Sequence, residues 1–154
     1  MFRLLKLIHF IGMILMLGSI FTFVLISVVT KVFSPDEPDF GRIIIAFGTY
    51  LLTFPGIWLL VLSGIWMGYI KYGFKSRFVQ IKFILGLLII LNGYLFVLPA
   101  VKLATTLAMH GQISSAYHAA YMQESSFGAI NVLIAIIAAI VGIWRIGDTK
   151  SKKD

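Results

Sequence analysis

The feature that most constrains this chain is a set of four long apolar stretches, the first of which runs from Leu7 to about Thr30. A helix needs about 20 mostly apolar residues to cross the hydrocarbon core of a bilayer. Across the whole sequence 60% of the residues are hydrophobic and only 12% are charged, whereas soluble domains average about 25% charged residues. The chain is therefore predicted to be an all-α membrane protein.

Polar loops divide the apolar stretches. We expect membrane helices at about residues 4–32, 43–70, 78–98 and 127–146. The acidic loop FSPDEPDF follows the first helix, the basic loop KYGFKSR follows the second, and the third is expected to stop at Pro99. The segment 99–126 is expected to extend its neighbouring helices or to form a short interfacial helix, and the tail 147–154 is expected to be flexible. Residues 1–154 then form a single transmembrane domain.

Lysine and arginine are distributed unequally between the two expected sides. Ten of the 13 lie on the side of the N terminus, and the other three are Lys31, Arg42 and Lys102. Because cytoplasmic loops carry the excess of basic residues, we predict an antiparallel four-helix bundle in the inner membrane, with both termini cytoplasmic. The net charge of +7 follows from this distribution, and no nucleic-acid partner is expected. The first apolar stretch exceeds the core of a signal peptide, so we expect it to be retained.

The second predicted helix carries a G-x-x-x-G pair, Gly64 and Gly68. Small residues at this spacing let helices approach closely, either within the bundle or across the interface of a homo-oligomer. Pro55, near the middle of the same helix, is expected to kink it because proline lacks the N–H that the helix ladder uses. The freed carbonyl then needs another partner, such as water or a hydroxyl.

Two of the His, Lys, Arg, Asp and Glu residues lie about a turn or more from either end of a predicted span, His9 near the start of the first and Lys82 near the start of the third. Such groups cost about 2.5–3.5 kcal/mol on insertion scales and therefore favour a functional role. The predicted topology places both residues in the same leaflet, where they could share a ligand. Two simpler interpretations remain open. Lys82 could extend to the headgroups, and His9 could form only a structural hydrogen bond.

Helical spacing adds Met13 and Met16 to the face of His9. Imidazole is an axial ligand of haem iron, and His with Met is a known axial pair. Thioethers also suit copper(I), whereas methionine on a helix often only fills an apolar core. An alternative metal site, or a solvated loop, lies near the expected outer surface and contains His110, His118 and Met122.

Several classes of chemistry are excluded or disfavoured. The chain has no cysteine, which excludes disulfides, iron–sulfur clusters and thiolate metal sites. It also has no phosphate-binding glycine loop, no H-E-x-x-H motif and no G-x-S-x-G motif. Glu124 is the one acidic residue near a helix rather than in a loop or tail, which argues against paired-carboxylate catalysis. Asn92 and Asn131 are expected in mid-helix, where they could bond across helices or contact a ligand.

Three segments resemble helices of the HemJ and CopD-like superfamily of membrane proteins. They are LLKLIHFIGMILMLGS, with an early His; LTFPGIWLLVLSGIWMGYI, with a Pro before a Gly-rich stretch; and FVQIKFILGLLIILNGYLFVLPAVKLA, with an early Lys. The likeness covers roughly residues 4–105 and is closest to a related predicted integral membrane family of unknown function. HemJ is a haem-containing protoporphyrinogen oxidase whose early His and third-helix Lys are linked to activity. The resemblance implies corresponding roles for His9 and Lys82.

Three functional hypotheses follow. The first is binding of haem b or another tetrapyrrole near the cytoplasmic leaflet, with His9 as axial ligand, Lys82 pairing with a propionate, and Met13 and Asn92 in the pocket. Such a protein would be an oxidoreductase, in electron transfer or porphyrin oxidation, with a porphyrin or quinone as partner. The second is copper handling through His9, Met13 and Met16. The third is a non-catalytic assembly protein that associates through the G-x-x-x-G face.

Overall fold

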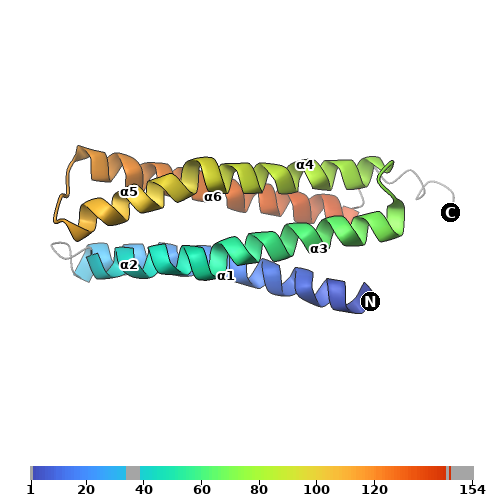
Figure 1. The fold of residues 1–154 in the computed structure, drawn as a ribbon, viewed down its shortest axis with the longest axis horizontal. Coiled ribbons are helices and arrows are strands. Elements are labelled where there is room, and N and C mark those ends of the chain that lie inside the picture. Colours follow the sequence, from blue (N-terminus) through green and yellow to red (C-terminus); the bar gives the residue numbers. More distant parts are fainter. Residues whose placement is uncertain (1, 34–38, 145, 147–154) are drawn as a thin grey trace.

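Four long helices lie side by side along the long axis of the molecule (Figure 1). The structure is a computed structural model that describes residues 2–33, 39–144 and 146, and these contain no strand. The four spans are Phe2–Thr30, Phe40–Tyr72, Arg77–Met109 and Ser115–Trp144. Each is long and apolar enough to cross a membrane, which indicates a multi-pass membrane protein. The tail 147–154, expected to be flexible, lies outside the described residues.

Two of the spans are interrupted by a π-helical turn. The first span is α1 (Phe2–Phe33), and the fourth is α6 (Ser115–Trp144). The second consists of α2 (Asp39–Gly48), a π turn (Thr49–Thr53) and α3 (Phe54–Tyr72). The third consists of α4 (Arg77–Asn92), a π turn (Gly93–Val97) and α5 (Leu98–Met109).

The predicted end of the third helix at Pro99 is wrong, because the helix continues to Met109. The segment 99–126 extends the third helix and contains the beginning of the fourth, so the expected extension is confirmed. Its alanines and other helix-compatible residues carry the helices beyond the most apolar stretch. Helix α2 begins at Asp39, before the predicted start of the second helix near residue 43, and this places Arg42 inside a helix.

A π turn precedes each proline within the spans. The amide of Phe54 donates to the carbonyl of Thr49, and the amide of Leu98 donates to that of Gly93, each one residue further back than in an α-helix. A proline ring clashes with the carbonyl four residues before it and provides no N–H. The wider turn admits one extra residue before the proline, so the helix continues through it. The same pattern, Tyr-Leu-x-x-x-Pro, occurs at both turns, as YLLTFP and YLFVLP.

Helices α1 and α3 cross at a contact between two glycines. A Cβ atom on Gly12 would lie 2.5 Å from the backbone nitrogen of Leu60, and one on Gly56 would lie 2.7 Å from that of Met16. Only glycine permits so close an approach, which brings the two backbones into van der Waals contact. The core cluster beside this crossing consists of Met16, Ile57, Val61 and Ile89.

A groove separates α1 from α6. Helix α1 packs on α2 and α3, and α6 packs on α4 and α5, whereas no extensive packing joins α1 to α6 among the described residues. The span Ser115–Trp144 is the least buried of the four, and Phe40–Tyr72 is the most buried. Two cavities lie between α1 and α6, each with a floor formed by the second and third spans. We call this feature the α1–α6 groove.

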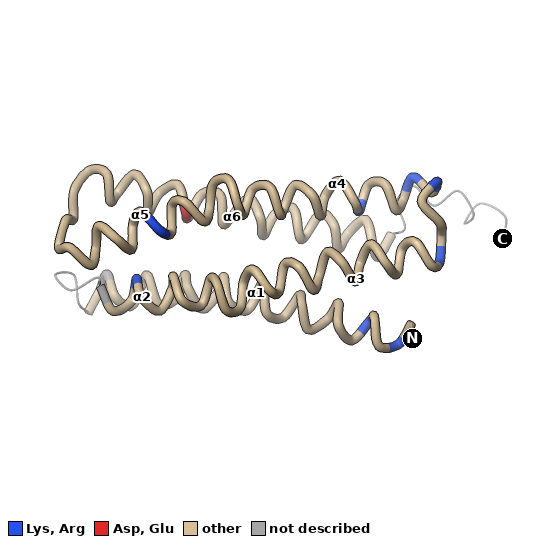
Figure 2. Tube along the Cα trace, viewed as in Figure 1, with Lys and Arg blue, Asp and Glu red and all other residues tan. Residues whose placement is uncertain are grey.

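Basic residues gather at one end of the molecule (Figure 2). This end carries the start of α1, the turn between α3 and α4, and the end of α6, while the turn between α5 and α6 lies at the other end (Figure 1). We call the first of these the basic end. The half of the groove nearest to it is the inner half, and the remainder is the outer half.

The glycine crossing can be tested by adding a single methyl group. Gly12→Ala is expected to lower the free energy of unfolding by about 1–3 kcal/mol, since its Cβ has no room against the backbone of α3. Gly18 lies on the same helix and has nothing within 4 Å of an added Cβ, so Gly18→Ala should be neutral or slightly stabilising. Denaturant titration in detergent micelles measures both variants. Equal effects would contradict the crossing.

Candidate functional site

The inner half of the α1–α6 groove contains a cavity of about 170 Å³. Helix α1 contributes His9 and Met13 to its lining, and α4 contributes Lys82. The rest of the lining is apolar or glycine and comes from all four spans. The structure thus brings together two of the ionisable residues that the sequence placed in the same leaflet.

His9 is oriented by a hydrogen bond to the backbone of α3. Its Nδ1 lies 2.9 Å from the carbonyl oxygen of Leu60 and 3.1 Å from the hydroxyl of Ser63. A carbonyl oxygen can only accept, so in a neutral imidazole Nδ1 carries the proton and Nε2 keeps its lone pair. The hydroxyl of Ser63 itself donates to the carbonyl of Leu59. Histidines that bind metals commonly donate their other ring N–H to a backbone carbonyl in this way.

Gly64 makes room for the ring of His9. A Cβ atom at Gly64 would lie 3.0 Å from the Cε1 atom of His9. Gly68, the other glycine of the G-x-x-x-G pair, contacts Val79 of α4 and is buried. Both glycines therefore pack against residues of the same chain, and the homo-oligomer through this face stays a prediction.

Lys82 has no carboxylate partner among the described residues, where the one ion pair joins Arg42 to Glu124. Its ammonium lies 5.2 Å from the centre of the Phe78 ring. A Cβ atom on Gly142 of α6 would lie 2.7 Å from the same nitrogen. An unpaired ammonium beside a cavity is suited to an anionic group of a ligand, because a membrane offers few other partners for it.

The other predicted ligands lie away from His9. Met16 is fully buried in the core cluster and does not line the inner cavity. Asn92 bonds to α6 and lines neither cavity. The alternative outer cluster is exposed and consists of His110, His118 and Met122. Within the part of the chain that the structure describes, no three His, Asp or Glu residues gather in a group that could hold a metal ion.

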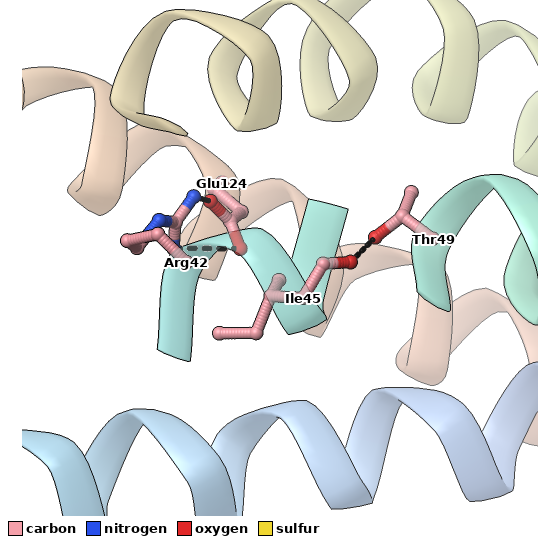
Figure 3. A network of polar contacts seen from close by, with 4 residues as sticks. All are labelled: Arg42, Ile45, Thr49 and Glu124. Carbon is pink, nitrogen blue, oxygen red and sulfur yellow. Dashed lines mark hydrogen bonds and ion pairs between the residues drawn. The ribbon is translucent and has the colours of Figure 1, made fainter. Parts of the chain in front are cut away.

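A buried ion pair joins α2 to α6 in the outer half of the molecule (Figure 3). The guanidinium of Arg42 contacts both carboxylate oxygens of Glu124, with Nη1 3.3 Å from Oε1. The side chains are only 4% and 16% exposed, respectively. In the same span as Arg42, the hydroxyl of Thr49 donates to the carbonyl of Ile45 at 2.7 Å. The bidentate geometry is the strong form of this contact.

The sequence alone did not indicate the Arg42–Glu124 pair, because it assigned Arg42 to a loop. One signal was available. An arginine and a glutamate both bordered apolar stretches on the same expected side, and ionisable groups at such positions usually pair.

A second polar contact joins Asn92 to Asn131, two residues that were expected in mid-helix, where they could bond across helices or contact a ligand. The Asn92 amide donates to Oδ1 of Asn131 and to the carbonyl of Phe127, both at 2.8 Å.

Comparisons with protein-family models, with curated proteins and with solved structures find no match to this chain. Its function is therefore inferred from the residues and their arrangement.

The buried ion pair leads to a stability prediction. Arg42→Ala or Glu124→Ala alone should lower the free energy of unfolding by about 3–5 kcal/mol, because each leaves one buried charge without its partner. The double variant Arg42→Met with Glu124→Leu should recover most of that loss. Lys102→Ala removes an exposed cation from the same half and should change stability by less than about 0.5 kcal/mol. Additive losses in the double variant, measured by denaturant titration, would contradict the pairing.

Proposed function

We propose that the protein is an inner-membrane protein that binds a tetrapyrrole, haem b, at the inner cavity, with His9 as axial ligand. The observation that carries this proposal is the bond from Nδ1 of His9 to the carbonyl of Leu60, because it leaves Nε2 as a donor atom for iron. Lys82 lines the same cavity. Its ammonium would pair with a haem propionate.

The donor set favours haem over a bare copper ion. A porphyrin supplies the in-plane ligands of its own iron, so the protein needs to add only axial ligands. Copper would have to be held by His9 and Met13 alone, since Met16 lies in the core. The copper hypothesis is therefore the second candidate.

The size of the cavity sets a condition on the proposal. Small-molecule sites usually measure about 300–1,000 Å³, and the inner cavity encloses about 170 Å³. A tetrapyrrole therefore has to extend beyond the enclosed volume, into the α1–α6 groove. The absence of extensive packing between the two helices leaves that direction open.

When bound, haem b supplies one-electron redox chemistry, so the proposed class is an oxidoreductase in electron transfer or porphyrin oxidation. The chain itself holds the iron ligand in one tautomer and places a cation beside it. The apolar lining of the cavity limits access of water to the site.

We infer that the helices form an antiparallel bundle with both termini in the cytoplasm. The gathering of lysine and arginine at the basic end (Figure 2) supports this orientation. His9 and Lys82 would then lie in the cytoplasmic leaflet.

The haem proposal predicts a Soret band in the purified protein. His9→Ala should abolish the band, and Lys82→Met should weaken haem binding more than Lys82→Arg does, because arginine keeps the charge. His118→Ala removes an exposed histidine and should leave the spectrum unchanged. The measurement is the absorbance of oxidised and dithionite-reduced protein from haem-replete cells.

Two outcomes of this experiment would overturn the haem proposal. A colourless protein with stoichiometric copper that is lost in Met13→Leu would favour the copper hypothesis. A protein with neither haem nor copper would favour the non-catalytic hypothesis, in which His9 serves only to join α1 to α3.

The proposed orientation can be tested directly because the natural chain has no cysteine. Lys75→Cys lies in the exposed turn at the basic end, and Gln112→Cys lies in the exposed turn at the opposite end. In intact cells, a membrane-impermeant maleimide should label only Gln112→Cys. Labelling of Lys75→Cys alone would reverse the proposed topology.

A further inference from the structure

The outer half of the α1–α6 groove contains a second and larger cavity, of about 410 Å³. This volume is in the usual range of small-molecule sites. The lining is mainly aliphatic and aromatic, including Phe23, Phe54 and Val97, with a few polar groups that include Thr49 and Asn131. His9 and Lys82 do not line it, so the cavity is separate from the proposed haem site.

A buried polar group in this cavity, the NH₂ of Asn131, lacks a hydrogen-bond partner among the described residues. Asn92 must point its NH₂ toward Asn131, because the same NH₂ also donates to the carbonyl of Phe127. Asn131 therefore presents Oδ1 to Asn92, and its own NH₂ points elsewhere. That NH₂ has no hydrogen-bond partner among the described residues, although only 3% of the Asn131 residue is exposed.

The unpartnered amide is open to the cavity. Two other polar atoms without a partner, Nε of Arg42 and the hydroxyl of Thr105, are fully enclosed by the protein. The NH₂ of Asn131 is not fully enclosed in this way. Asn131 lines the cavity, as does Gly93. Gly93 has no side chain that could cover the amide of Asn131. A Cβ atom built on Gly93 would lie 3.8 Å from the amide nitrogen, in van der Waals contact with it. A buried donor without a partner is destabilising, and a ligand acceptor would offset that cost.

The depth of this donor restricts the ligand. At about 1.5 Å per residue, Asn131 lies about 24 Å from Ser115 and about 20 Å from Trp144, near the middle of α6. Phospholipid ester and headgroup oxygens lie at the edges of a core about 30 Å thick, and so about 15 Å from its centre. The required ligand is instead an apolar molecule with an acceptor oxygen that resides inside the hydrocarbon region. The gap between α1 and α6 gives it lateral access.

We propose that the outer cavity binds the carbonyl-bearing head of an isoprenoid quinone, with the NH₂ of Asn131 donating to a quinone oxygen. A quinone ring is flat and apolar and fits beside the aromatic side chains of the lining. Its isoprenoid chain extends through the gap between α1 and α6 into the lipid. The site depends on Asn131 and on the space beside Gly128, and it does not require that a tetrapyrrole binds at His9.

The test is equilibrium binding of a one-isoprenoid benzoquinone to the full chain in lipid nanodiscs. Gly128 lines the cavity and has nothing within 4 Å of an added Cβ, so Gly128→Leu should fill the space while the fold is retained. This variant should lower quinone affinity at least tenfold. Gly18→Leu makes the same change where space is also free but outside the cavity lining, and it should bind as the native chain does. His9→Ala should also bind normally.

The hydrogen bond is tested from both sides of the contact. Asn131→Leu should lower quinone affinity about tenfold, the value of one buried hydrogen bond. A carbonyl-free analogue with the same isoprenoid chain should bind the native chain about tenfold more weakly than the quinone, and should not distinguish the native chain from Asn131→Leu. Equal binding of quinone and analogue by the native chain would overturn the proposal in favour of an acyl-chain site. Unchanged quinone binding in Gly128→Leu would overturn the location.

Discussion

The close approach of α1 and α3 at Gly12 and Gly56 is the contact on which the remaining arrangement depends. In a membrane, water provides no hydrophobic drive between helices, so van der Waals contact between backbones has to hold α1 in place. With α1 held against the second span, the imidazole of His9 reaches a carbonyl of α3. The same attachment keeps α1 away from α6, which packs on the third span. The groove and both of its cavities result from that separation.

Much of the fold was predictable because a bilayer leaves few choices. Backbone groups in hydrocarbon must bond within their own segment, so the four apolar stretches had to form helices. The expectation failed at Pro99, where proline was treated as an end of the helix. A π turn over Gly93–Val97 accommodates the proline instead, and nothing in the hydropathy pattern distinguishes a stop from such a turn. The extensions into 99–126 were recognisable only from helix propensity.

The sequence predicted the candidate site correctly where the position of a residue along its helix determines which residues meet. His9 and Lys82 share a cavity because each lies near the start of a span that begins at the basic end. Asn92 and Asn131 were expected in mid-helix, but nothing in the sequence indicated that they bond to each other. The failures concern rotation about the helix axis. Met16 falls on the face of His9 by helical spacing, yet it packs into the core, and the partner of Glu124 depended on where α2 begins. Sequence spacing fixes which residues share a face but not which neighbour that face meets.

The two π turns also set the rotation, about the helix axis, between the helix segments that precede and follow each turn. An α-helix rotates by about 100° per residue, and each π turn adds one residue to the ring that its hydrogen bond closes. In the second span, Gly56 follows the π turn and contacts α1, while Arg42 precedes the turn and pairs with Glu124 of α6. Loss of one residue from the turn Thr49–Thr53 would swing these faces out of phase by about 100°. The number of residues between the glycine crossing and the ion pair therefore fixes the angle between the two helix faces that carry them. An insertion or deletion in this segment would change that angle, whichever side chains it adds or removes.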